Sequence, residues 1–145
     1  MKKRTAFLLS VIMALSTLFA SAFPASANDV APCLYNSCEA SVAFGISDSG
    51  IASFGVCYTG YEPTFIQAEV SVEIQKRTML LFWSTVDIGE YNNVWIGYSS
   101  DLHGLIEKSF QLSDKGTYRA VYTLKFYGTG DGIDVIEDTI EAKYD

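Results

Sequence analysis

A strict alternation of apolar and polar residues is the feature that most constrains this chain. From residue 66 to residue 75, five apolar residues alternate with five polar ones. A second run has the same period and begins at Tyr118, with apolar residues at every second position as far as Phe126. A period of two sends successive side chains to opposite faces of an extended strand. Each run therefore predicts a strand with one buried face and one wet face.

A hairpin is predicted where residues 40–46 and 51–58 flank a short turn sequence. A three-residue loop that ends at Gly50 gives glycine the left-handed backbone that such a loop needs. The resulting register sets Phe44 against Phe54, which places both aromatic side chains in the core.

More strands are predicted at residues 79–86, 105–112 and 136–144. Residues 87–103 lack clean alternation and are expected to be irregular, with a short edge strand near residues 94–98 at most. About seven short strands without a helical period predict an all-β sandwich.

The first 27 residues have the order of a secretory signal peptide. Lys2, Lys3 and Arg4 precede an uncharged, largely apolar run from Thr5 to Phe23, and the small residues Ala25-Ser26-Ala27 follow. Such segments are removed during export. We therefore expect cleavage after Ala27 and a secreted, extracellular chain of residues 28–145, free or at the cell envelope.

Removal of that segment leaves seven basic residues against seventeen acidic ones, a formal charge of −10. Such a surface repels nucleic acid and anionic lipid, so neither is expected as a partner, and no membrane association is expected after cleavage. We expect a single-domain monomer without a cofactor.

Three cysteines follow the signal: Cys33, Cys38 and Cys57. Export to a non-reducing space predicts one disulfide and one remaining thiol. The hairpin register puts Cys57 near Ser41, so we expect Cys57 to bond to Cys33 or Cys38, with Cys33–Cys38 as the alternative pairing. Zinc is disfavoured because the spacing lacks a paired C-x2-C and His103 is distant.

The segment from Asp114 to Tyr118 reads D-x-G-x-Y, the pattern that opens the sixth strand of immunoglobulin-like domains. It predicts a tyrosine corner, in which the Tyr118 ring packs inward and its hydroxyl meets the backbone. Ala120 stands where antibody domains carry a cysteine. The fold class is therefore predicted as an immunoglobulin-like antiparallel β-sandwich without the antibody-type disulfide.

The chain after the signal also resembles small secreted proteins of Gram-positive bacteria. The resemblance rests on the order of four motifs, S-x-S-G-x-A-S (Ser47–Ser53), V-E-I-Q-K (Val72–Lys76), F-W-S-T-V (Phe82–Val86) and K-G-T-Y-R (Lys115–Arg119). It implies export and a β-sandwich, and it implies no particular chemistry.

Residues suited to catalysis are few. The sole histidine, His103, follows Asp101 by two positions, but no G-x-S-x-G elbow accompanies them. Acids are plentiful, yet Glu69 and Glu73 fall on a predicted solvent face. No catalytic residue is assigned, and a small secreted hydrolase with unrecognised carboxylate chemistry is kept as the alternative function.

A calcium site is a weak candidate in the glycine-rich segment 128–134. Asp131 and Asp134 would supply carboxylate oxygens there, and glycine lets backbone carbonyls turn inward. A flexible turn with solvated acids is favoured, because the segment does not match an EF-hand.

Aromatic residues give the best binding candidates. Tyr91, Trp95 and Tyr98 lie in the irregular segment and suit contact with a protein or a glycan, although closing one end of the sandwich is the favoured role. Trp83 lies mid-strand and is expected in the core. The predicted function is a non-catalytic secreted module that binds a protein or a glycan at the cell envelope.

Overall fold

The computed structural model describes residues 26–30, 35–130 and 132–145, with the backbone alone at 26–30 and at 38. The described residues form nine strands and one 3-10 turn, where the sequence predicted about seven strands. The elements are β1 (Ser26–Val30), β2 (Ser37–Ile46), β3 (Ile51–Gly60), β4 (Phe65–Thr78), β5 (Phe82–Thr85), η1 (Tyr91–Asn93), β6 (Val94–Ser99), β7 (His103–Gln111), β8 (Gly116–Gly128) and β9 (Ile133–Tyr144).

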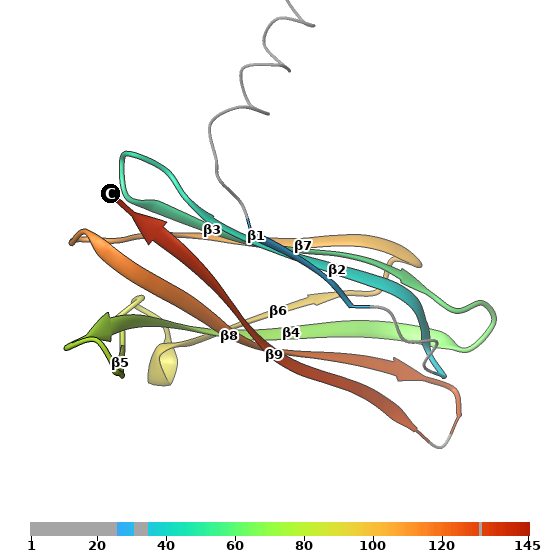
Figure 1. Ribbon diagram of the computed structural model, residues 1–145. Helices are drawn as coiled ribbons and strands as arrows, with labels where there is room; N and C mark the ends of the chain where they lie inside the picture. The colour runs from blue at the N-terminus through green and yellow to red at the C-terminus, as the bar shows by residue number, and fades with distance from the viewer. Residues whose placement is uncertain (1–25, 31–34, 131) are drawn as a thin grey trace, which may run out of the picture.

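The strands form two antiparallel sheets that lie face to face (Figure 1). The first sheet has the order β1-β2-β3-β7, and the second has the order β5-β4-β8-β9. Strand β4 is long enough to pair with two strands along one edge. It pairs with β6 through Ala68–Glu73 and with β5 through Gln75–Thr78. The all-β prediction is confirmed, with the sheets stacked as in a sandwich.

The core lies between the sheets and follows the predicted alternation. In β4 the apolar residues Ala68, Val70, Val72 and Ile74 are buried, and the polar residues between them face outward. Ile66 is an exception and is 52% exposed. The pairing of β4 with β8 shifts between Phe65 and Gln67, and this irregularity lies beside Ile66.

The predicted β2–β3 hairpin is confirmed in register. Phe44 pairs with Phe54, and both rings are buried. Gly50 has a φ of 79°, the left-handed conformation that the loop requires. Local turn chemistry was therefore sufficient to place these two strands.

Tyr118 makes the contact of a tyrosine corner at the start of β8. Its side chain is buried, and its hydroxyl donates to the backbone carbonyl of Asp114 at 2.5 Å. The turn from β7 into β8 is thereby tied to the core.

The region around the expected signal cleavage site is only partly described. Residues 1–25 lie outside the described part, and β1 spans the expected cleavage point after Ala27, with Ser26 opposite Phe44. A chain that begins at Asn28 would keep the β1 pairs from Asn28 to Val30. Within the described residues, no helix is long and apolar enough to cross a membrane.

Candidate functional site

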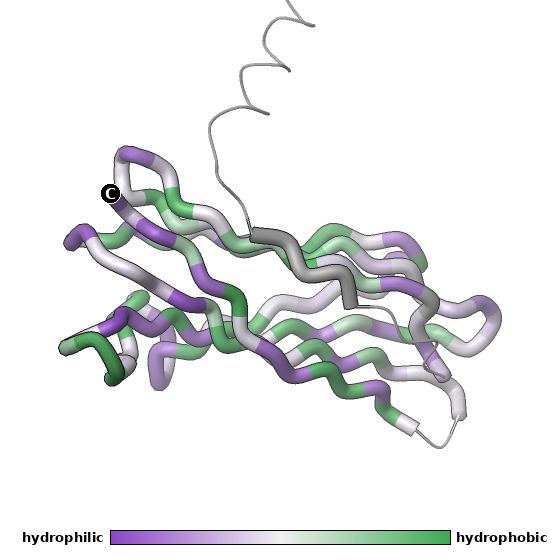
Figure 2. Tube along the Cα trace, in the orientation of Figure 1, coloured by the Kyte–Doolittle hydropathy of each residue, from purple (hydrophilic) through white to green (hydrophobic). Residues whose placement is uncertain are grey.

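An apolar hairpin tip projects from the end of the second sheet. The sequence predicted one strand over residues 79–86, but the chain turns at Met79–Leu81 and resumes as β5 at Phe82. The exposed fractions are 87% for Met79, 88% for Leu80, 82% for Leu81 and 66% for Phe82. Figure 2 shows this hydrophobic tip at the same end of the sandwich as the C-terminus. Four consecutive large apolar residues exposed to this degree make the tip a candidate contact site.

The backbone of this tip is unusual for its residues. Met79 and Leu80 have φ values of 47° and 62°, in the left-handed region. That conformation costs roughly 1–2 kcal/mol per residue for ordinary side chains, and asparagine or glycine adopts it more readily. Elsewhere this chain uses Asn92 and Asn93 for the same conformation. The tip thus carries apolar side chains where folding alone favours small polar ones.

Trp83 lies directly behind the tip. The sequence predicted Trp83 in the core, but it lies outside the core. It pairs with Arg77 in the β4–β5 register, and odd-numbered residues of β4 face outward. The guanidinium carbon of Arg119 lies 4.3 Å from the ring centroid, and that of Arg77 lies 4.8 Å away. The prediction was wrong because alternation alone does not say which face of a short strand is buried.

The charges at this end are mostly paired. Arg77 meets Glu141 at 3.1 Å, and Lys76 meets Asp114 at 3.4 Å. The Nε atom of Arg119 donates to the neutral amide oxygen of Gln75 at 2.8 Å. Exposed pairs of this kind add little stability. The contacts of Arg77 and Arg119 hold these two side chains at Trp83, whereas Lys76 lies over the Tyr118 ring.

The three aromatic binding candidates do not form one surface. Trp95 is half-buried and packs edge-on against Phe110, with ring centroids 6.5 Å apart. Tyr98 lies on the opposite face of β6 and is 57% exposed, and Tyr91 is 88% exposed in η1. Trp95 therefore has the packing role that the sequence favoured. Asn92, which follows Tyr91 in η1, is a turn residue.

Of the two acids in the predicted calcium site, the structure describes Asp134. Its carboxylate accepts hydrogen bonds from the backbone. It is buried, and its two carboxylate oxygens accept the N–H groups of Tyr35 (3.1 Å) and Asn36 (2.6 Å). Each carboxylate oxygen of Asp134 thus has one backbone donor, which gives this buried acid a structural role. Asp131 lies outside the described residues. In the part of the chain that the structure describes, no three His, Cys, Asp or Glu side chains are grouped to hold a metal ion.

Cys57 is a free, exposed cysteine, which contradicts the predicted bond to Cys33 or Cys38. It pairs with Ser41, whereas Cys38 lies at the irregularity between Ser37 and Glu39. Cys38 is three residues away from Ser41, the residue opposite Cys57. The two cysteines are therefore offset by roughly 8–10 Å along the strands, which is more than the Cα separation that a disulfide spans. Cys33 and the alternative Cys33–Cys38 pairing lie outside what the structure describes.

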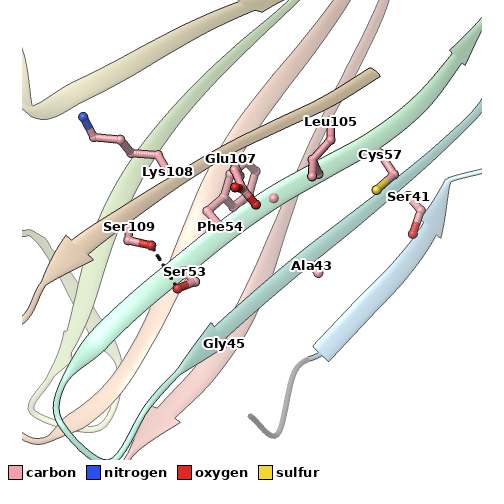
Figure 3. Close-up of a pocket in the computed structure, with 11 residues that line it drawn as sticks. Ser41, Ala43, Gly45, Ser53, Phe54, Cys57, Leu105, Glu107, Lys108 and Ser109 are labelled. Atoms are coloured by element: carbon pink, nitrogen blue, oxygen red, sulfur yellow. Dashed lines mark hydrogen bonds between the residues drawn. The ribbon is translucent and has the colours of Figure 1, made fainter. Parts of the chain in front are cut away.

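A shallow depression of about 570 Å³ lies on the outer face of the first sheet (Figure 3). Small residues form most of its floor, among them Ala43, Gly45 and Gly55, and the thiol of Cys57 lies beside them. Ser53 and Ser109 share a hydrogen bond of 3.1 Å within it. Among the described residues of this lining, no hydrogen bond joins the Cys57 thiol or a serine hydroxyl to the Glu107 carboxylate.

His103 lies outside this depression. Its Nδ1 atom is 3.3 Å from the Thr59 hydroxyl, and both residues pair across β3 and β7. Within the described residues, no carboxylate is hydrogen-bonded to the imidazole. The Asp101 spacing noted in the sequence therefore gives no orienting contact.

A polar cluster on the outer face of the second sheet was not predicted. Glu69 accepts hydrogen bonds from the Lys125 ammonium (2.9 Å) and the Tyr127 hydroxyl (2.8 Å). Burial works to raise the pKa of Glu69, but these two donors outweigh it and hold the pKa below its ordinary value. The cluster joins β4 to β8 across the sheet, where cross-strand pairs stabilise the register.

Comparisons with models of protein families, with curated proteins and with solved structures give no match to this chain.

Proposed function

We propose that this chain is a secreted, non-catalytic module of immunoglobulin-like topology that binds a component of the cell envelope through the β4–β5 hairpin tip, Met79–Phe82. The observation that carries the proposal is the exposure of four consecutive large apolar side chains at that tip. Left-handed backbone at Met79 and Leu80 supports it, because strain of this kind persists at sites kept for function.

The strand order supports the immunoglobulin-like assignment. The neighbours β2-β3-β7 match the A-B-E order of one immunoglobulin sheet, and β4-β8-β9 match the C-F-G order of the other. Tyr118 then stands at the start of the sixth strand, with the hydroxyl contact that defines the tyrosine corner. Loops at the ends of such sandwiches commonly carry the residues that bind a partner.

The tip replaces residues 87–103 as the favoured contact region. An apolar tip suits an apolar acceptor better than a sugar, which is bound by stacking and hydrogen bonds. A glycan therefore becomes the less favoured of the two ligand classes expected from the sequence, and a protein or another apolar envelope component is favoured.

Binding to isolated Gram-positive cell envelopes tests this proposal. The secreted chain should sediment with the envelopes, and a variant with Met79→Asn and Leu80→Gly should stay in the supernatant. Ile133→Asn is the matched control, because Ile133 is 53% exposed at the start of β9, where it pairs with Tyr127 far from the tip. If the tip variant sediments as well as wild type, the proposal is wrong.

A further inference from the structure

We propose that the β4–β5 hairpin tip inserts into the interfacial layer of an anionic lipid bilayer, with Arg77, Trp83 and Arg119 at the depth of the headgroups. This inference rests on the proposed function and names the envelope component that the tip contacts. It departs from the expectation that overall negative charge keeps the chain away from such membranes.

The shape of the tip favours lipid over a protein surface. The exposed apolar group is one turn of three residues followed by Phe82, and it projects from the end of β4 rather than forming a flat face. A flat interface buries an apolar centre inside a polar rim. A narrow projection instead fits between headgroups, where interfacial segments place apolar side chains roughly 5–10 Å deep.

The side chains behind the tip match the chemistry of the membrane interface. Trp83 adjoins Phe82, and the guanidinium groups of Arg77 and Arg119 lie over its ring at 4.8 and 4.3 Å. Tryptophan prefers the headgroup level, and long cationic side chains keep their charge in water while their stems cover apolar surface. The apolar tip and the aromatic and cationic layer therefore follow each other in the order in which a bilayer would meet them.

The distribution of basic residues supports binding to an anionic lipid surface. Of the seven lysines and arginines after residue 27, five lie at this end: Lys76, Arg77, Lys115, Arg119 and Lys143. Three of them pair with Asp114, Glu141 or Asp145. The end with the tip thus balances its local acids, although the chain as a whole carries excess negative charge. Basic residues held close to a bilayer are attracted by anionic lipid.

Flotation with lipid vesicles tests the inference on the secreted chain. We expect binding to phosphatidylcholine vesicles that contain phosphatidylglycerol, with weaker binding to phosphatidylcholine alone and in high salt. The variant with Met79→Asn and Leu80→Gly should bind on the order of a hundredfold less, because two large apolar side chains no longer leave water. That variant should also fold, since both substitutions suit left-handed backbone. Ile133→Asn should bind like wild type.

Fluorescence locates the contact, because the chain has two tryptophans. With Trp95→Phe, the remaining Trp83 should shift to shorter wavelength on vesicles and should be quenched by brominated lipid. With Trp83→Phe, the remaining Trp95 should show neither change. Equal responses from both tryptophans would contradict insertion at this end.

The outcomes separate the two proposals. If wild type ignores vesicles but still needs the tip to bind envelopes, the lipid inference is overturned and a protein partner replaces it. If vesicles bind wild type and the tip variant equally, the inference is also overturned. If envelope binding does not depend on the tip at all, the proposed function fails as well.

Discussion

The Asp134 carboxylate accepts the backbone N–H of Asn36 at 2.6 Å and joins segments that lie 98 residues apart in the chain. The Asn36 side chain completes the junction by donating to the carbonyls of Gly132 (2.8 Å) and Phe126 (3.2 Å). A Cβ at Gly128 would lie 1.9 Å from the Asn36 amide oxygen, so glycine is needed for this close approach. The entry into β2 is thereby tied to the β8–β9 hairpin.

Asp134→Ala should lower the free energy of unfolding by about 3 kcal/mol, because it leaves two backbone N–H groups without their charged acceptor. Asp134→Asn should cost less, since it keeps one acceptor oxygen. Glu137→Ala, at an exposed acid on the same strand, should change stability by less than about 0.5 kcal/mol. Urea unfolding measures all three. A calcium-dependent rise in Tm that Asp134→Asn abolishes would contradict this structural role.

Tyr118→Phe should cost about 1 kcal/mol, because the Asp114 carbonyl loses its hydroxyl donor. Tyr118→Ala should cost roughly 3–5 kcal/mol, because it also leaves a cavity in the core. Tyr91→Phe serves as the control, since Tyr91 is exposed and its hydroxyl should be dispensable. Equal denaturation midpoints for Tyr118→Ala and wild type would disprove the tyrosine corner.

Glu69→Gln should destabilise the chain by about 1 kcal/mol at neutral pH and by progressively less in acid. The pKa of Glu69 is lowered in the folded state, so its ionised form contributes stability above the unfolded-state pKa. That contribution disappears as the pH falls through the lowered folded-state value. Stability curves of wild type and variant should therefore converge at low pH. A constant difference across the range would show that the ion pair with Lys125 is not the cause.

Cys57 should react with maleimide in the folded chain, because it is free and exposed on β3. Labelling of Cys57 should be complete without denaturant or reductant, and Cys57→Ser should remove one label per chain. Peptide mapping under non-reducing conditions provides the second measurement. Recovery of Cys57 in a disulfide with Cys33 or Cys38 would show that the exported chain differs from this structure.

The double substitution Met79→Asn and Leu80→Gly should raise the free energy of unfolding by about 1–2 kcal/mol. Both positions have positive φ, where asparagine and glycine avoid the strain of larger side chains. Thermal unfolding measures the change. A lower Tm for this variant would mean that the exposed apolar residues stabilise the fold, and their role at the tip would then be structural.

Part of the fold could be predicted from the sequence, but the candidate site could not. Tyr118 was placed by its local D-x-G-x-Y pattern, and the Phe44–Phe54 register followed from the turn at Gly50. The apolar run at residues 79–82 predicted part of a strand over residues 79–86, whereas the chain turns there. A pattern of consecutive apolar residues indicates burial in most chains, and it carries no sign of a turn when Gly, Asn and Pro are absent.

The sequence by itself determined most of the strands and the register of the β2–β3 hairpin, because alternation and turn residues act between near neighbours. Only the tertiary structure decided which strand faces find a partner. Trp83 faces outward because residue 83 pairs with residue 77, and Asp134 is structural because a segment 98 residues away supplies its donors. The Met79–Phe82 tip is exposed because β4 continues to Thr78, past the last core residue of that strand, Ile74. Such long-range relationships depend on how the two sheets stack, which no local pattern specifies.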